Sequence, residues 1–201
     1  MSMSRRELLK SLSAAAAGAP AARVLMLRLV TPEAAQQAHR AVSAEKAASL
    51  TGGYTPKFFS AHQYKTLREL CQTIIPADHE SGGAVEGGAP EFLDLIASEN
   101  QDIQLQLGGG IMWLDSECVE RYGSNYVECS ATHKDEILNL IAFRKNAEKD
   151  SRLGPGVEFF SALRKGVADG FFTSEIGIKY LGYIGNTYLT EFPGCPPVPE
   201  L

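Results

Sequence analysis

Residues 60–76, SAHQYKTLRELCQTIIP, decide the class of fold. Ser60 and Gln63 have the spacing of a capping box, in which the serine oxygen accepts from a first-turn amide and the glutamine reaches back. Apolar side chains then recur at helical spacing: Tyr64, Leu67, Leu70, Cys71, Ile74 and Ile75. Pro76 ends the predicted helix because it lacks the amide hydrogen that a further turn needs.

Helical periodicity also dominates the chain beyond that helix. After a glycine-rich loop at residues 77–88, helices are expected from Pro90, over about 100–121, over 132–147 and from Pro155 onward. Both prolines suit a first helical turn, where the missing amide hydrogen has no partner to lose. The sequence shows no useful strand alternation and no internal repeat. It therefore predicts an all-α, single-domain helical bundle.

Two segments leave their structure open. Residues 33–50 are alanine-rich and fit either an exposed helix or a loose linker, because few of their apolar residues are larger than alanine. Residues 108–110 are three glycines inside a helical pattern, with no strand before them. They indicate a kink or a packing contact, and not the glycine-rich turn that binds a flavin or nicotinamide dinucleotide.

The first ten residues fit an export address better than a structural element. Arg5 and Arg6 precede a leucine pair, Lys10 and an alanine-rich stretch, which is the layout of a twin-arginine signal. Arg23 and Arg28 interrupt the apolar region, so a basic amphipathic helix is the alternative interpretation. Export would make the twin-arginine translocase a partner and the periplasm the destination.

These features divide the chain into three parts. Residues 1–43 are predicted to be the signal and a linker, 44–57 a further linker, and 58–201 the helical domain. The small residues Ala41 and Ser43 offer a cleavage site at the end of the first part. Whether cleavage takes place stays open.

Composition and charge restrict the function. With 44% hydrophobic and 21% charged residues, the 201-residue chain is typical of a folded globular protein. Residues 1–30 hold five of the 19 Lys and Arg and one of the 24 Asp and Glu, so 14 basic and 23 acidic residues remain, a net charge of −9. Such an acidic body repels phosphate backbones, which argues against nucleic-acid binding. No run approaches the ~18 uninterrupted apolar residues of a membrane span.

The four cysteines would meet an oxidising compartment after export, where disulfides persist. Three complete pairings exist for Cys71, Cys118, Cys129 and Cys195, and the sequence does not choose among them. Cys71 falls on the apolar side of its helix and is expected as a buried thiol. Cys118 and Cys129 flank a turn-like segment at 122–125, so a short bridge between them is predicted to contribute roughly 2–3 kcal/mol.

The sequence shows no catalytic centre, and we expect no catalytic, cofactor-binding or metal-binding residue in this chain. Residues 78–80, Asp-His-Glu, are the one cluster of metal-ligand types. Three consecutive residues do not easily face one ion, and a solvated turn is the competing interpretation. A haem attachment motif, a zinc-type pair and a nucleophile elbow are missing from the sequence. A free-standing periplasmic metal-dependent enzyme and an envelope binding protein remain as alternatives.

Aromatic residues gather near the C-terminus. Residues 171–192 hold six of the chain's 17 aromatics, with glycines among them: Phe171, Phe172, Tyr180, Tyr183, Tyr188 and Phe192. Two interpretations stay open. The segment is either a partner surface, because aromatic anchors dominate interface energetics, or a core corner where the last helix packs.

Several sequence blocks together point to a family. They are LREL at 67–70, IIPAD at 74–78, Gly83-Ala84 to Phe92-Leu93-Asp94, GFFTS at 170–174, Gly177, YLGY at 180–183, Gly185-Asn186 and GCP at 194–196. On these blocks the chain resembles the small subunit, subunit 3, of membrane-bound gluconate 2-dehydrogenase complexes, over about residues 58–197. The C-terminal blocks are the most specific part, and the twin-arginine leader also fits the family.

The resemblance implies an accessory role. In such complexes an FAD-carrying oxidoreductase subunit performs the chemistry, and a cytochrome c subunit with haem c passes electrons toward the quinone pool. The small subunit would be non-catalytic, would export the folded flavoprotein through its own signal, and would stabilise it. The complex would then be periplasmic and associated with the cytoplasmic membrane. The family has no established catalytic residues to transfer, and its name does not fix the substrate.

We expect the aromatic C-terminal segment to form the docking surface for the large subunit. The predicted contacts with the large subunit are Phe171, Phe172, Tyr180 and Tyr183. Cys195 lies in a proline-flanked tail and is predicted to form an intermolecular disulfide with that subunit. Internal pairing with Cys71 is the rival interpretation.

Overall fold

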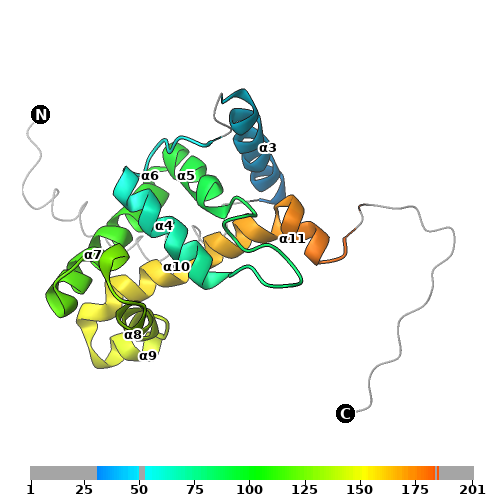
Figure 1. Cartoon of the computed structure of the whole chain (residues 1–201). Helices are drawn as coiled ribbons and strands as arrows, with labels where there is room; N and C mark the ends of the chain where they lie inside the picture. Colours follow the sequence, from blue (N-terminus) through cyan, green and yellow to red (C-terminus); the bar gives the residue numbers. More distant parts are fainter. Residues whose placement is uncertain (1–30, 50–52, 184, 186–201) are drawn as a thin grey trace, which may run out of the picture.

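The computed structural model describes residues 31–49, 53–183 and 185 (Figure 1). Every regular element in these ranges is helical, which confirms the predicted all-α class. The longer helices are α3 (Pro32–Ala48), α4 (Ala61–Ile74), α5 (Ala89–Glu99), α7 (Gly109–Tyr122), α8 (Ala131–Ile141) and α10 (Gly154–Phe172). The shorter elements are α6 (Gln101–Ile103), the π-helical turn η1 (Gln104–Gly108), α9 (Arg144–Lys149), α11 (Glu175–Tyr180) and two 3₁₀ turns, η2 (Tyr126–Glu128) and η3 (Ser151–Leu153).

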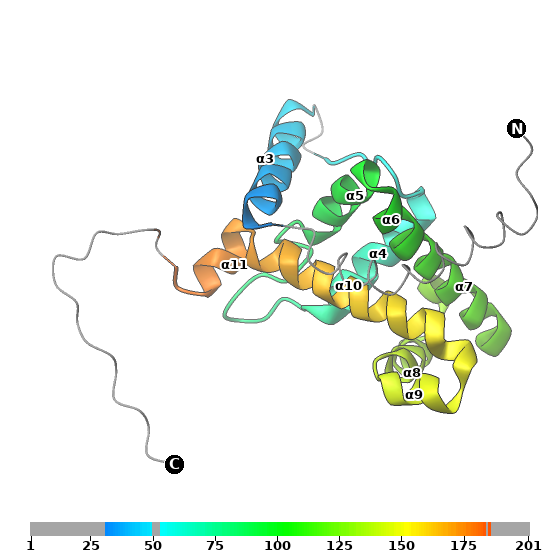
Figure 2. The same ribbon diagram turned by 180° about the vertical axis from the view of Figure 1, so that it is seen from behind.

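Helix α10 is the element against which the rest of the bundle packs. It lies against α4, α5 and α7, with α8 and α9 near its first turns and α11 beyond its last turn (Figures 1 and 2). Pro155 occupies its first turn, as the sequence predicts. Its buried face carries large apolar side chains and glycines at helical spacing: Gly156, Val157, Phe159, Phe160, Leu163, Val167, Gly170 and Phe171.

Residues 32–48 form a helix, which is one of the two structures that the sequence left open for residues 33–50. The Thr31 side chain caps α3 by accepting from the Ala34 amide at 3.2 Å. Ala35, Ala38 and Val42 are buried, and α3 packs on α5. The folded unit therefore includes α3, and cleavage after residue 43 would cut through this helix.

A buried carboxylate fixes the chain between α3 and α4. Asp94 of α5 is fully buried and accepts four hydrogen bonds. Its donors are the Tyr54 hydroxyl at 2.8 Å and the amides of Lys57, Phe58 and Phe59 at 2.6, 3.1 and 2.9 Å. Three amides and a hydroxyl aimed at one carboxylate hold residues 54–59 against α5. This segment leads directly into α4.

Two local features that the sequence indicated are present: the capping box before α4 and the glycine contact at the start of α7. The capping box of α4 is complete, with the Gln63 amide on Ser60 Oγ at 3.3 Å and the Ser60 amide on Gln63 Oε1 at 3.1 Å. The three glycines lie where the π-helical turn η1 passes into α7, and Gly110 makes the expected packing contact, since a Cβ there would lie 2.0 Å from the Phe159 ring. Helix α10 approaches α7 that closely only because Gly110 has no side chain.

The helix predicted over 132–147 is divided in two. Phe143 is extended, at φ −122° and ψ 125°, and separates α8 from α9.

Within the described ranges, no helix is both long enough and apolar enough to cross a bilayer.

Candidate partner interface

A tight corner joins α10 to α11 and is built from the GFFTS block at 170–174. Ser174 caps α11, because its Oγ accepts from the Gly177 amide at 3.1 Å and donates to the Phe171 carbonyl at 2.6 Å. Thr173 Oγ1 donates to the Asp169 carbonyl at 2.6 Å. These bonds pair two carbonyls at the end of α10 and one amide at the start of α11, groups that a helix end otherwise leaves without an intrahelical partner.

Two glycines of the family pattern allow close contact at this corner. A Cβ on Gly177 would lie 2.1 Å from the Phe171 carbonyl oxygen, and a Cβ on Gly170 would lie 2.8 Å from the Phe92 ring. Both distances are below any real Cβ contact, so α11 sits on the end of α10, and α10 on α5, only because glycine is present. These glycines explain part of the family pattern by packing.

Phe171 belongs to the core and presents no ring to a partner in this structure. It is 2% exposed, and its ring covers Gly87, where a Cβ would lie 2.9 Å away. Its prediction as an interface contact therefore has to be corrected. Consecutive residues on a helix point about 100° apart, and it is the next residue, Phe172, that faces outward. The core-corner interpretation holds for Phe171.

The remaining predicted aromatics lie on the outside of the corner. Phe172, Tyr180 and Tyr183 are 40%, 48% and 55% exposed, and Leu181 beside them is 60% exposed. We call these four residues the C-terminal face. Phe172 packs on the Phe171 ring, with the two rings edge to face and their centroids 5.1 Å apart. A group of large apolar side chains held outward on a fixed corner is the arrangement found where a partner docks.

A cleft of about 600 Å³ between α3 and α11 adjoins the C-terminal face. Its lining residues are Gln36, His39, Arg40, Thr173, Glu175, Ile178, Lys179 and Tyr183. Its walls carry both charges, and Lys179 pairs with Glu175 at 2.7 Å, which lowers the pKa of that carboxyl. Helix α3 therefore forms part of the candidate interface, as well as part of the core.

His39 connects the cleft to the core. Its Nε2 lies 3.1 Å from Thr173 Oγ1, and its ring stacks on Phe92 with centroids 5.2 Å apart. Burial lowers the pKa of His39, because the charged imidazolium would lose solvation there. The sequence analysis missed this residue. Its position could have indicated burial, because Ala35, Ala38, His39 and Val42 recur at helical spacing. That pattern is weak, since two of its four residues are alanines.

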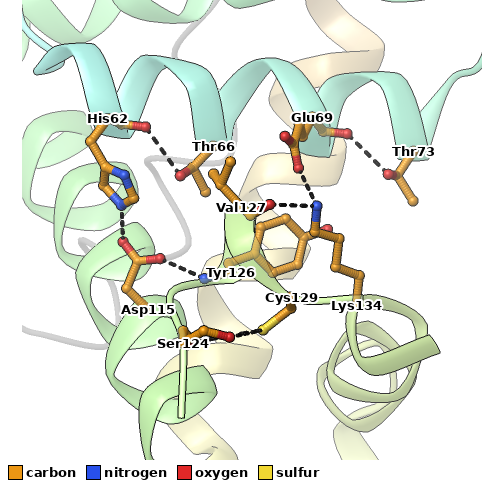
Figure 3. A network of polar contacts seen from close by, with 10 residues as sticks. All are labelled: His62, Thr66, Glu69, Thr73, Asp115, Ser124, Tyr126, Val127, Cys129 and Lys134. Carbon is orange, nitrogen blue, oxygen red and sulfur yellow. Dashed lines mark hydrogen bonds and ion pairs between the residues drawn. The ribbon is translucent and has the colours of Figure 1, made fainter. Parts of the chain in front are cut away.

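The cysteines occupy two different places in the described chain. Cys71 is a fully buried thiol on α4, as predicted, and burial raises its pKa. Cys118 and Cys129 are both thiols, so the predicted bridge is not formed in this structure. They are neighbours all the same, and the Cys129 thiol also donates to the Ser124 carbonyl at 3.6 Å (Figure 3).

The remaining candidate residues add no chemistry to this face. Asp78 is exposed, and its Oδ1 accepts from the amides of Glu80 and Ser81 at 2.8 and 2.9 Å, which makes residues 78–81 a solvated turn. Among the described residues, no three His, Cys, Asp or Glu side chains gather where they would hold a metal ion. The export residues Arg5 and Arg6, and Cys195, lie outside the described residues.

Comparison with known proteins identifies the family. The model of the family described as gluconate 2-dehydrogenase subunit 3 matches residues 61–194, from the start of α4 through α11 and on into the tail. Comparison with characterised proteins and with solved structures gave no significant match. The matched range contains Asp94, the α10–α11 corner and the C-terminal face, whereas the Asp94 donors in residues 54–59 precede it. The chain therefore belongs to the gluconate 2-dehydrogenase subunit 3 family, whose members are accessory subunits associated with a dehydrogenase complex.

Proposed function

We propose that this chain is the non-catalytic small subunit of a periplasmic, membrane-associated, FAD-dependent dehydrogenase of sugars or sugar acids. The FAD would lie in the large oxidoreductase subunit and haem c in a cytochrome c subunit. The small subunit would stabilise the flavoprotein and provide the export signal for both. Family membership supports the association with a dehydrogenase complex.

One observation carries the docking part of this proposal. The C-terminal face is formed by large apolar side chains that stand outward from a corner fixed by Ser174 and Gly177. Single exposed apolar residues are common on monomers, but four on one short segment are characteristic of a surface that another protein covers. Little ordering entropy would be lost on binding, because the corner is already rigid.

Co-purification with the large subunit tests this docking surface. Phe172→Ala and Leu181→Ala should each weaken capture of the large subunit by about tenfold or more, as central apolar anchors do. Leu105→Ala is the matched control, because Leu105 is 69% exposed but lies on η1, away from the corner. Circular dichroism should show unchanged helix content in all three variants. Loss of capture in Leu105→Ala alone would move the interface to η1 and refute the proposed face.

The leader would export the flavoprotein as a folded partner. The twin-arginine layout at Arg5 and Arg6 is read by a receptor, so lysine at both positions should retain the large subunit in the cytoplasm. The control is Arg23→Lys with Arg28→Lys, which makes the same chemical change in the same leader outside the twin-arginine pair. Dehydrogenase activity in periplasmic fractions is the readout. Periplasmic activity equal to that of the wild type would refute the escort role.

A covalent link to the large subunit would pass through Cys195. The rival internal partner, Cys71, is buried inside α4, and its raised pKa leaves little of the thiolate that disulfide exchange needs. The purified complex should therefore show a band of both subunits on a non-reducing gel that reductant and Cys195→Ser each abolish. A small subunit that runs alone without reductant would exclude the link.

The two alternative functions have different signatures. A free-standing metal-dependent enzyme would retain stoichiometric metal through purification, and Asp78→Ala with His79→Ala would remove it. An independent envelope binding protein would lack a neighbouring gene for a large FAD-binding oxidoreductase. No contact in the described residues favours either of them over the accessory subunit.

A further inference from the structure

We propose that Cys118 and Cys129 form an intramolecular disulfide once the chain has reached an oxidising compartment. The location rests on the proposed export, but the pairing itself rests on the geometry of the α7–η2 hairpin. Sequence alone leaves three complete pairings open. Among the three described thiols, the structure brings Cys118 and Cys129 near each other.

The two sulfurs are brought together by the way α7 ends. Cys118 lies in the last turns of α7, and Gly123 ends the helix with φ 77°, a left-handed conformation that glycine adopts without strain. The chain then reverses through η2, and the Cys129 amide donates to the carbonyls of Asn125 and Tyr126 at 3.1 and 3.2 Å. After this reversal the two buried thiols lie near enough for Cys129 to raise the pKa of Cys118.

Contacts other than the sulfurs already fix this hairpin (Figure 3). Asp115 of α7 accepts from the Tyr126 amide at 3.0 Å and from His62 Nε2 at 2.7 Å. Lys134 of α8 donates to the Val127 carbonyl at 3.0 Å and to Glu69 of α4 at 2.7 Å. Because three helices hold the turn, the hairpin is already formed before the bond closes. The thiol form and the disulfide form therefore share one fold.

The third described thiol does not compete for either sulfur. Cys71 has Glu91 and Arg68 as its charged neighbours, whereas Cys118 has Asp115 and Glu117. Cys71 lies on α4 and Cys118 on α7. Of the other two described cysteines, Cys129 is the one that acts on the pKa of Cys118.

The oxidation is a two-electron exchange with a disulfide of the thiol–disulfide oxidoreductase class. Cys129 is the less deeply buried sulfur, at 7% exposed against 0% for Cys118. Its thiolate attacks the oxidant's disulfide, forms a mixed disulfide and releases one thiol of the oxidant. The Cys118 thiolate then attacks the Cys129 sulfur, so that the protein S–S bond forms and the second thiol leaves. Two protein thiols lose two protons and two electrons, and the oxidant becomes a dithiol.

Burial makes this exchange slow in the fully folded chain. It raises the pKa of Cys118 to about 12, so the attacking thiolate is scarce at neutral pH. The chain would therefore keep both thiols while it folds in a reducing compartment, and would close the bond after transfer to an oxidising one. The bond would then restrain the hairpin that joins α7 to α8.

Purified full-length chain, reduced and then treated with oxidised glutathione under brief partial denaturation, tests the pairing directly. Maleimide labelling of Cys118 and Cys129 should be lost together, while Cys71 stays labelled after unfolding. Trypsin cuts at Arg121 between the two cysteines, but no Lys or Arg lies between Cys71 and Cys118. Trypsin combined with a glutamate-specific protease therefore separates all three and yields one cross-linked peptide pair.

The oxidised chain should melt about 5–10 °C above its reduced form, since the bond closes a loop of about 12 residues. Cys118→Ala and Cys129→Ala should each abolish this difference, and the double variant should lose no more than either alone. Both thiols still labelled after oxidation, or a Cys71–Cys129 peptide, would overturn the assignment. The chain could form the bond in vitro and yet keep both thiols reduced in cells. That result would refute export to an oxidising compartment, and not the pairing.

Discussion

Gly177→Ala should displace α11 and thereby weaken capture of the large subunit. The added Cβ would lie 2.1 Å from the Phe171 carbonyl oxygen and 2.8 Å from its carbonyl carbon. These are backbone atoms, so no rotamer change relieves the overlap and α11 has to shift by about 1 Å.

The expected magnitude follows from two opposing effects. Overpacking of this kind costs about 1–3 kcal/mol, and replacing a helical glycine by alanine returns up to about 1 kcal/mol of helix propensity. The steric term is the larger, which leaves a net cost of about 1–2 kcal/mol. Because α11 is a short helix at the end of the bundle, detachment of α11 relieves this cost more easily than global unfolding does. The docking-competent fraction would then fall, and affinity for the large subunit would drop about 5- to 30-fold.

Gly109→Ala is the matched control for this experiment. Gly109 is helical, with φ −62°, and a Cβ there meets nothing within 4 Å. The same chemical change should therefore raise the free energy of unfolding by about 0.5–1 kcal/mol and leave capture unchanged. Hydrogen exchange over residues 174–181 and co-purification are the two readouts. Wild-type exchange and wild-type capture in Gly177→Ala would refute the view that this glycine positions the C-terminal face.

Two further predictions concern the supports of the interface. Asp94→Asn turns one acceptor oxygen into an amide group that faces the Lys57 amide and the Tyr54 hydroxyl. Urea unfolding should show that the free energy of unfolding falls by about 2–4 kcal/mol, against about 1 kcal/mol for Tyr54→Phe. Equal losses in the two variants would contradict the role of Asp94 in holding residues 54–59. The lowered pKa of His39 favours its neutral form when folded, so this residue contributes stability above pH 6.5 that is lost as the pH falls below 6.5 toward the folded pKa. His39→Gln should therefore flatten the decline of unfolding free energy between about pH 7.5 and 5, and an unchanged slope would contradict the assignment.

Local sequence signals predicted most of the helices. The capping box at Ser60, the first-turn prolines and the turn-like segment at 122–125 act through hydrogen bonds and φ angles within four residues, so they can be read without knowledge of the fold. The split at Phe143 was missed because the apolar period continues across it. Helix α3 was left open because small alanines give a weak period, although Ala35 and Ala38 are buried.

The sequence by itself determined the helical class, the family and the candidate aromatic segment. Only the tertiary structure decided which of two adjacent phenylalanines faces outward, that Asp94 holds residues 54–59, and that Cys118 adjoins Cys129. The burial of Phe171 depends on the packing of α10, which Gly110 and Gly170 allow to lie close to α7 and α5. The other two depend on the hydrogen bonds of Asp94 and on the α7–η2 hairpin. Helix periodicity and caps arise from neighbours in sequence, whereas burial, long-range hydrogen bonds and sulfur contacts arise from packing between distant segments, which no local pattern encodes.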